Sequence, residues 1–145
     1  MSTHSAIILK VKESDKGKTF KFDETKLPTK LIGWDDYGEK DEDKCRNVTL
    51  SGDYIGVYCH WDGYPSGVGE ALKNNFKTYE DVLNLIVGGF CSSVEDKGVK
   101  HYANRKGEKW DWIKPIQGSI SHLSINLDFE YLYVFENNSW KVNEC

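Results

Sequence analysis

The sequence predicts a single α+β domain, in which an antiparallel sheet of about five strands carries two consecutive helices on one face. Three patterns predict this class. Residues 6–11 and 54–61 resemble buried strands, residues 68–87 have apolar side chains at helical spacing, and residues 131–142 resemble a hairpin. The expected order is β-β-β-α-α-β-β. A chain of 145 residues is long enough for one such domain, spanning 1–145, with a substantial core.

The N-terminal third begins with a buried strand and ends in a charged segment. Residues 6–11 are almost entirely apolar, and residues 19–22 alternate so that Phe20 and Phe22 share one face. We therefore expect these two segments to form a hairpin. Residues 23–53 have little periodicity and many charges, which is typical of a surface insertion.

Two helices are predicted in the middle of the chain. Apolar residues recur at helical spacing from Val68 to Phe76, which indicates the first helix. Thr78 is the expected cap of the second helix, whose first turn is acidic and so suits the positive end of the helix dipole. Gly88 and Gly89 are expected to end it.

The C-terminal third is less regular until its last residues. Residues 92–114 are mixed and predicted to be rich in loops. Residues 119–127 are ambiguous, but their apolar side chains alternate, which favours a strand. Residues 131–142 alternate on both sides of Asn137 and Asn138, and asparagine tolerates the positive φ of a tight hairpin turn.

Composition limits the functional classes. A formal net charge of −4 disfavours general nucleic-acid binding, which needs a basic face. Aromatic residues make up 13% of the chain, as a ring-rich core or a ring-lined pocket would require. We expect a cytoplasmic protein, because the sequence has neither a signal-peptide pattern nor an apolar run that could span a membrane.

The four cysteines give no sign of a metal site. Cys45, Cys59, Cys91 and Cys145 are far apart and form no C-x-x-C pair. Free thiols are expected, and the sequence predicts neither a metal nor a cofactor.

The most informative segment is the elbow, which we define as residues 58–70, with the sequence Tyr-Cys-His-Trp-Asp-Gly-Tyr-Pro-Ser-Gly-Val-Gly-Glu. His60 and Asp62 would point the same way on an extended segment, and a carboxylate raises the pKa of a neighbouring imidazole and orients it as a general base. The alternatives are a hydrogen-bonded pair that fixes the strand end, or a metal site that would need further ligands. Cys59 should face the opposite side of the strand, so a catalytic thiol is not expected.

Two further segments could bind an anion. The glycines around Ser66 enter a helix, where free N–H groups attract anions, although the segment lacks the Lys-Ser/Thr of a phosphate-binding loop. Residues 97–112 interleave cations with rings, which would suit the phosphate and base of a nucleotide. The alternatives are a plain helix start capped by Ser66 and a solvated loop. An acidic run within 35–44 could mimic phosphates or be a solvated loop.

The ligand site predicted from these patterns draws on the elbow and on two basic residues of the 97–112 segment. Its members are His60, Trp61, Asp62, Tyr64, Ser66, Gly67, Gly69, Arg105 and Lys106.

Two segments of the chain resemble a group of small bacteriophage and prophage proteins. They are the opening Met-Ser-Thr-His-Ser-Ala-Ile and the elbow's Tyr-Cys-His-Trp-Asp-Gly-Tyr-Pro, and residues 130–142 resemble the group's closing hairpin. His4 stands where the group usually has arginine. The resemblance spans most of the chain except residues 23–53.

The resemblance implies a phage or mobile-element origin, and small phage proteins often counter host defence. The leading expectation is therefore a non-enzymatic anti-defence binding protein in the cytoplasm of the host bacterium. Its partner would be a nucleotide-like anionic signal molecule, and a homo-oligomer could build a shared pocket. One alternative is an anti-CRISPR-like inhibitor that binds a host defence protein. The other is a small hydrolase with His60 as base and Asp62 as its orienting group.

Overall fold

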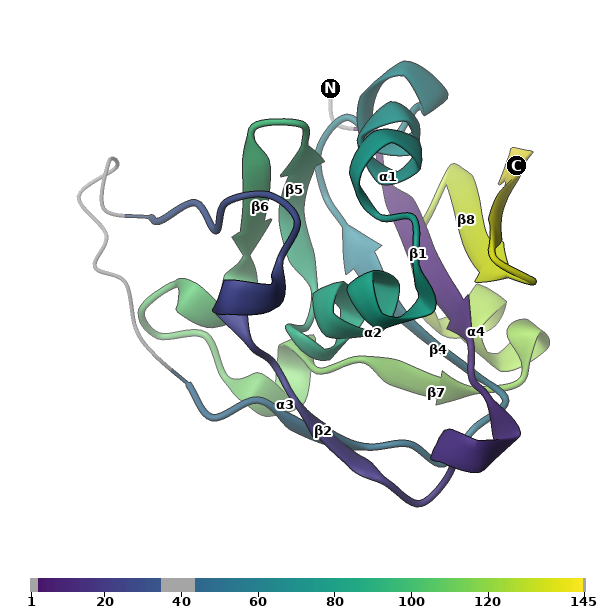
Figure 1. The fold of residues 1–145 in the computed structure, drawn as a ribbon. Coiled ribbons are helices and arrows are strands. Elements are labelled where there is room, and N and C mark those ends of the chain that lie inside the picture. The colour runs from purple at the N-terminus through teal and green to yellow at the C-terminus, as the bar shows by residue number, and fades with distance from the viewer. Residues whose placement is uncertain (1–2, 35–43, 145) are drawn as a thin grey trace.

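The computed structural model describes residues 3–34 and 44–144, and a mixed sheet runs through its centre (Figure 1). Six strands follow the order β6-β5-β4-β1-β8-β9, and a seventh strand, β7, pairs with β4. The strands are β1 (Ser5–Lys10), β4 (Tyr54–Cys59), β5 (Cys91–Glu95), β6 (Gly98–His101), β7 (Ile116–Gly118), β8 (Tyr131–Glu136) and β9 (Ser139–Glu144).

The α+β class and the single domain are confirmed, but the sheet is larger than predicted and is not purely antiparallel. Strand β1 is antiparallel to β4, with Ile7 opposite Val57, and parallel to β8, with Ile7 opposite Tyr133. Strand β4 is also parallel to β5. The extra strands β5, β6 and β7 are three to five residues long and lie in segments without clear alternation.

The predicted hairpin between the first two strands is wrong. Strand β2 (Thr19–Lys21) pairs with β3 (Asn47–Thr49) in a separate two-stranded sheet. Both edges of β1 are already occupied, by β4 and β8, so a second hairpin partner has no free backbone groups to pair with. The short 3-10 helix Glu13–Asp15 turns the chain away from β1.

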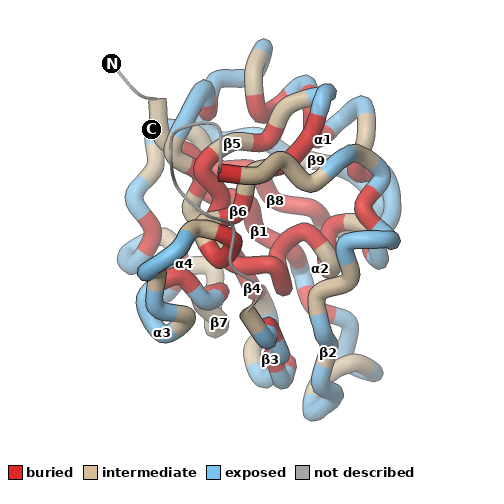
Figure 2. The backbone as a smooth tube through the Cα atoms, turned by 90° about the vertical axis from the view of Figure 1, so that its left-hand side faces the viewer, coloured by how far each residue is buried: buried red, intermediate tan, exposed pale blue. Residues whose placement is uncertain are grey.

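Helices cover both faces of the sheet rather than one. Helices α1 (Glu70–Asn75) and α2 (Tyr79–Val87) pack on the face that carries Ile7 and Leu9 of β1. Helix α4 (Ile120–Asn126) packs on the opposite face. Successive side chains of a strand point to opposite faces, so the unbroken apolar run of β1 fills both cores. The buried residues accordingly concentrate around β1 and its neighbours (Figure 2).

The strand predicted for residues 119–127 is wrong, because this segment contains helix α4 between the caps Ser119 and Leu127. The Ser119 hydroxyl caps this helix by accepting a hydrogen bond from the backbone N–H of His122, at 3.1 Å. Leu123 and Leu127 are four residues apart and both buried, whereas Ile125 between them is 82% exposed. The core therefore selects the helical spacing of these leucines.

The local signals at the other helix and hairpin ends are confirmed. The Thr78 hydroxyl accepts a hydrogen bond from the Asp81 N–H at 3.1 Å, and α2 ends at Gly88. Asn137 and Asn138 have φ values of 55° and 60° in the β8–β9 turn. Strand β4 leads through the elbow and a π-helical turn (Pro65–Gly69) into α1.

Residues 23–53 are not simply a surface insertion, because their described parts contribute to the core. Trp34, Arg46 and Leu50 are each at most 7% exposed, and Leu31 forms a bridge with Val99. The segment includes the 3-10 helix Glu24–Lys26 as well as β3. Most of the acidic run predicted within 35–44 lies outside the described residues.

The remaining elements are a 3-10 helix, Tyr102–Asn104, and the short helix α3, Trp110–Ile113. Within residues 3–34 and 44–144, no helix combines the length and apolarity needed to cross a membrane. Cys45, Cys59 and Cys91 are free, as expected, while Cys145 lies outside the described part of the chain.

Candidate functional site

The elbow is a tight turn. Its backbone N–H groups, which were predicted to bind an anion, donate instead to carbonyl groups within the elbow. Asp62 has a φ of 55° and accepts a hydrogen bond at its carbonyl from the Val68 N–H, at 2.8 Å. The N–H groups of Gly67 and Gly69 both donate to the carbonyl of Tyr64, at 2.9 and 3.4 Å. These hydrogen bonds order the turn, and an anion would have to compete with them for the same N–H groups.

Two glycines of the elbow are required by close packing. A Cβ atom on Gly67 would lie 2.3 Å from the Asp62 carbonyl oxygen, and one on Gly69 would lie 3.0 Å from the ring of Tyr133. The Tyr133 hydroxyl in turn donates to the carbonyl of Gly63 at 2.6 Å. Ser66 is exposed and does not cap the helical turn, since the capping position falls at Tyr64.

His60 and Asp62 take different partners and do not form the predicted dyad. His60 Nδ1 lies 2.6 Å from the Tyr58 hydroxyl, whereas Asp62 Oδ1 accepts a hydrogen bond from the Tyr64 hydroxyl at 3.2 Å. Desolvation and the nearby His4 lower the pKa of His60. An orienting carboxylate would have the opposite effect on the pKa.

An imidazole–carboxylate pair exists beside the elbow, but its members were not predicted. His4 Nδ1 lies 2.7 Å from Asp128 Oδ2, and the His4 ring is 4.9 Å from the ring of His60. His4 and Asp128 are 124 positions apart in the sequence, so no local pattern could predict this pair.

Part of the predicted site does meet at a cleft, which we call the elbow cleft. Trp61 and Asp62 form one wall, and Lys100 brings in the basic 97–112 segment. The cleft has a volume of about 490 Å³ and is lined by Trp34, Trp61, Asp62, Ser92, Ser93, Glu95 and Lys100. Arg105 lies behind this lining, with its Cζ 5.1 Å from the centre of the Trp34 ring, and Lys106 is exposed on the following turn.

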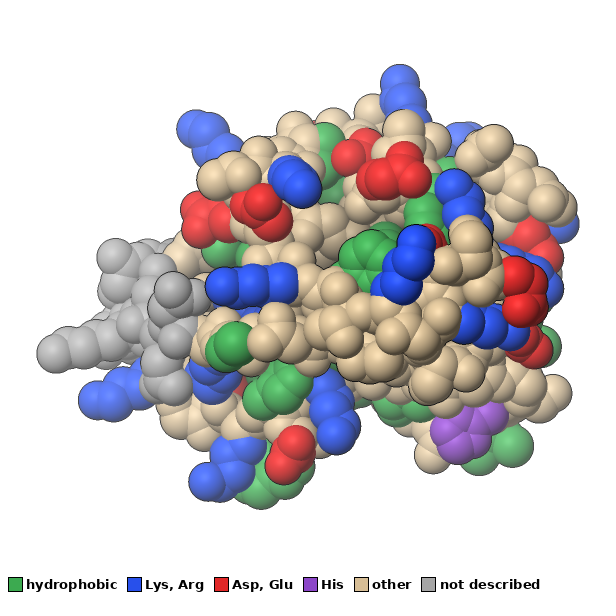
Figure 3. All heavy atoms as spheres, turned by 60° about the horizontal axis from the view of Figure 1, so that its bottom comes forward, with side chains coloured by type: hydrophobic (Ala, Val, Ile, Leu, Met, Phe, Trp, Pro, Cys, Tyr) green, Lys and Arg blue, Asp and Glu red, His purple; other side chains and the backbone are tan. Residues whose placement is uncertain are grey.

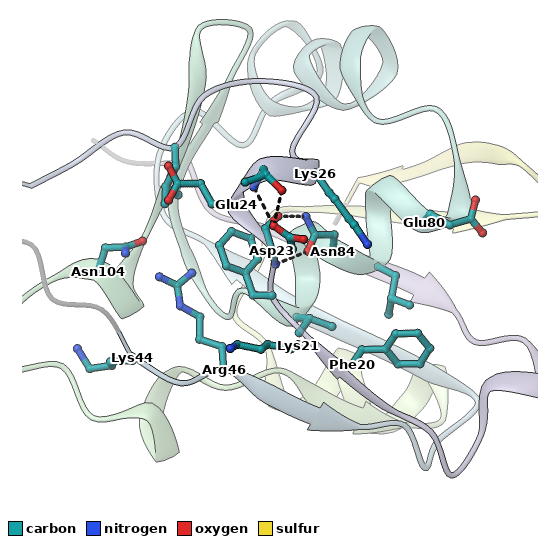
Figure 4. A pocket seen from close by; sticks show the side chains of 15 residues that line it. Phe20, Lys21, Asp23, Glu24, Lys26, Lys44, Arg46, Glu80, Asn84 and Asn104 are labelled. Atoms are coloured by element: carbon teal, nitrogen blue, oxygen red, sulfur yellow. Dashed lines mark hydrogen bonds between the residues drawn. The ribbon is translucent and has the colours of Figure 1, made fainter.

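A larger cleft, which the sequence did not predict, lies between β2, the 3-10 helix Glu24–Lys26 and α2 (Figure 4). We call it the Arg46 cleft. Its volume is about 740 Å³. Its lining is formed by Phe20, Lys21, Phe22, Asp23, Glu24, Thr25, Lys26, Leu31, Lys44, Arg46, Glu80, Leu83, Asn84, Val87 and Asn104.

Arg46 is the most constrained cation of this cleft. It is 3% exposed, its Cζ lies 4.5 Å from the centre of the Phe22 ring, and its Nη1 is 3.4 Å from His101 Nδ1. His101 is fully buried, and its Nε2 lies 3.0 Å from the Leu85 carbonyl oxygen. That carbonyl must accept, so Nε2 carries the proton and Nδ1 accepts from the guanidinium.

The protonation state of His101 supports this arrangement. Burial, reinforced by the charge of Arg46, lowers the pKa of His101 to about 3. The imidazole is therefore neutral near pH 7 and can accept a hydrogen bond from Arg46 without charge repulsion.

Other hydrogen bonds hold the walls of the Arg46 cleft. Lys44 Nζ donates to the carbonyls of Ala103 and Arg105, at 2.9 and 3.1 Å. Asn84 on α2 accepts from the Asp23 N–H at 2.9 Å and donates to the Asp23 carbonyl at 2.8 Å, which ties the 3-10 helix to α2 (Figure 4). Both walls are thus fixed before any ligand arrives.

Arg46 and the aromatic ring of Phe20 lie towards opposite ends of this cleft. Figure 4 shows Arg46, Lys44 and Asn104 towards one end, and Phe20 and Glu80 towards the other. Across the whole lining, four cations (Lys21, Lys26, Lys44 and Arg46) stand against three carboxylates (Asp23, Glu24 and Glu80).

One of these carboxylates has a structural role. Asp23 Oδ1 accepts hydrogen bonds from the N–H and the hydroxyl of Thr25, at 3.0 and 2.6 Å, and these bonds lower its pKa. Asp23 therefore stays ionised near neutral pH and remains one of the three carboxylates of the lining.

No family model, curated protein or solved structure matched the chain. The resemblance to small phage proteins stays a prediction. Within the described part of the chain, no group of three or more His, Cys, Asp or Glu residues is placed to hold a metal ion. The fold and the two clefts define a small α+β protein with clefts at its surface.

Proposed function

We propose that the protein is a non-enzymatic binding protein that captures a small, nucleotide-like anionic ligand in the Arg46 cleft. The observation that carries this proposal is the buried guanidinium of Arg46, stacked on Phe22 in the wall of a 740 Å³ cleft. The proposal moves the anion-binding role from the elbow, whose N–H groups are used internally, to this cleft.

The chemistry of Arg46 favours an anion. A guanidinium keeps its charge at all physiological pH values, and its planar fork matches the two oxygens of a phosphate or carboxylate. Contacts with Phe22 and His101 already fix its position, so ligand binding loses little side-chain entropy. Its burial also weakens dielectric screening and strengthens the attraction.

The remaining lining favours a ligand with a flat apolar part. Phe20, Leu83 and Val87 present aromatic and aliphatic surface away from Arg46, and a base could pack against it. Small-molecule sites usually enclose about 300–1,000 Å³, a range that includes this cleft. A ligand with a ring at one end and an acidic group at the other fits both halves.

The hydrolase alternative has less support. It requires His60 and Asp62 to act as a base and its orienting group, but each is hydrogen-bonded to a different tyrosine. The Arg46 cleft contains no histidine in its lining, so binding is the better account of its chemistry. If the phage resemblance is correct, capture of a signalling nucleotide in the host cytoplasm would serve an anti-defence role.

A thermal-shift panel of nucleoside mono-, di- and cyclic phosphates, each beside its unphosphorylated nucleoside, tests this function. At a hundred times its dissociation constant, a ligand adds about 2.7 kcal/mol of stability, which corresponds to roughly 5–10 °C in a domain of this size. We expect at least one phosphate to raise Tm while its nucleoside does not.

Two lysine variants make the test specific. Arg46→Lys keeps the charge but loses the planar fork, and we expect it to weaken binding at least tenfold. The matched control is Arg105→Lys, which alters the other arginine of the chain outside the Arg46 cleft and should leave affinity within twofold. A panel without any phosphate-dependent shift would contradict the proposal, as would full affinity in Arg46→Lys.

A further inference from the structure

We propose that the elbow cleft is a second, separate site that docks a basic segment of a protein partner. An arginine side chain of the partner would stack on Trp61 and pair with Asp62. This inference does not depend on the ligand of the Arg46 cleft, and the two sites share no lining residue.

Trp61 is an exposed but fixed aromatic anchor. Its residue surface is 46% exposed, and that of the neighbouring Tyr64 is 39% exposed. The backbone N–H of Trp61 donates to the Ser92 carbonyl at 2.9 Å, and the His60 ring packs edge-on against the Trp61 indole, with ring centres 4.7 Å apart and an interplanar angle of 87°. A rigid indole at the surface loses little entropy on binding and is typical of interface hot spots.

The charges of the elbow cleft favour a cation over a phosphate. Glu95 lies 3.9 Å from Lys97, and Lys100 stacks on Trp34. Asp62, beside Trp61, forms no ion pair within the described part of the chain, so its carboxylate is the group of this lining that a cation from a partner can pair with. The net charge of −4 of the whole chain adds a long-range attraction for a basic partner.

The same cleft already contains cations stacked on an indole. Lys100 Nζ lies 4.7 Å from the centre of the Trp34 ring, and Arg105 Cζ lies 5.1 Å from it. Trp34 is only 7% exposed, so these contacts are intramolecular. The exposed ring of Trp61 could make the same cation–π contact with a cation from another molecule.

The openness of the site favours a protein over a free small molecule. Small-molecule sites bury most of their ligand, whereas Trp61, Asp62 and Tyr64 are all exposed. A side chain projecting from a larger partner would gain the remaining contacts around the cleft, including Tyr64, whose hydroxyl is bonded to Asp62. Arginine suits it better than lysine, because a guanidinium both stacks on a ring and binds a carboxylate with two hydrogen bonds.

The protein offers a control surface in which an exposed indole and a carboxylate already have cations of the chain beside them. Lys109 Nζ lies 5.8 Å from the centre of the Trp112 ring, and Lys114 Nζ lies 3.6 Å from Asp111 Oδ1. Trp112 is 68% exposed, has Asp111 beside it and lies outside both clefts. On the face shown in Figure 3, hydrophobic side chains are scattered among Lys, Arg, Asp and Glu and form no continuous patch. Trp112 therefore tests whether an exposed indole and a carboxylate suffice without a cleft.

The experiment is a titration of the full chain with an acetylated, amidated tetra-arginine peptide, followed through the tryptophan indole N–H resonances at 50 and 150 mM salt. We expect the Trp61 signal to move saturably, tetra-lysine to bind more weakly and tetra-glutamate not to bind. Trp61→Ala should weaken binding at least tenfold and Asp62→Asn at least threefold. The controls Trp112→Ala and Asp111→Asn, which make the same chemical changes elsewhere, should stay within twofold.

Asp62→Asn keeps the test decisive if Trp61→Ala does not fold, because asparagine tolerates the positive φ at this position. Unchanged binding in Asp62→Asn, equal losses in Asp62→Asn and Asp111→Asn, or equal binding of tetra-glutamate would overturn the proposal. Arg46→Lys should leave peptide binding unchanged, so the failure of one site is distinguishable from the failure of the other.

Discussion

At the scale of single residues, burial decides which groups are chemically active. The thiols of Cys59 and Cys91 are fully buried, and burial raises the pKa of Cys59 to about 12, so it is not the nucleophile that its neighbour His60 suggests. Burial acts in the opposite direction on His101, whose pKa it lowers to about 3. The neutral imidazole of His101 accepts a hydrogen bond from Arg46 and so helps to hold its guanidinium in place.

The titration of His101 predicts a loss of stability in acid. An unfolded histidine has a pKa near 6.5, so between about pH 6.5 and pH 3 the unfolded state binds a proton that the folded state excludes. The contribution of His101 to stability is complete above about pH 6.5. It should fall by up to about 1.4 kcal/mol for each pH unit below that value.

Urea unfolding between pH 7.5 and pH 5 measures this slope. The variant His101→Gln should flatten it, because glutamine does not titrate. His60, whose pKa is also lowered, adds a smaller dependence of the same sign, which a His60→Gln variant can subtract. Equal slopes for the parent and His101→Gln would refute a neutral buried imidazole.

At the scale of elements, local signals were predicted well, and pairings between distant segments were not. The Thr78 cap, the glycines after α2 and the Asn137–Asn138 turn depend on neighbouring residues, and all three were predicted correctly. The parallel pairing of β1 with β8 joins segments more than 120 residues apart, which no local pattern encodes. Helix α4 was misread because Leu123 and Leu127 satisfy strand and helix spacing alike.

Helix α4 makes a direct prediction about stability. Leu123 is fully buried against Ala6 and Ile8, so Leu123→Ala should lower the free energy of unfolding by about 2–5 kcal/mol. Ile125→Ala should change it by less than about 0.5 kcal/mol, because Ile125 is 82% exposed. Chemical denaturation measures both values. Similar losses in the two variants would mean that these residues share a buried face, as they would in the strand first expected.

At the scale of the whole molecule, both clefts are built by segments that are distant in the sequence. The elbow cleft joins β4's end to β5 and β6, and includes five residues that were not among the predicted site: Trp34, Ser92, Ser93, Glu95 and Lys100. The Arg46 cleft needs β2 and β3 to leave the main sheet and pack beside α2. The alternation of Phe20 and Phe22 was the one sequence signal near it, but it was assigned to a hairpin with β1.

The two clefts also divide the chemistry that the sequence analysis had assigned to one site. The Arg46 cleft combines a buried cation with apolar walls, and the elbow cleft combines the exposed indole of Trp61 with the carboxylate of Asp62. A protein with both could hold a small anion on one side and a basic partner on another. This separation explains why no single cluster in the sequence accounted for all the rings and charges.

The most direct test of the central claim is a backbone amide titration by NMR with the nucleotide that gives the largest thermal shift, mapped on the full chain. We predict saturable shifts at the residues of the Arg46 cleft, above all at Phe22, Arg46 and Asn84, and their loss in Arg46→Lys. Saturable shifts confined to the elbow or scattered over the surface, or the same shifts in Arg46→Lys, would contradict the account.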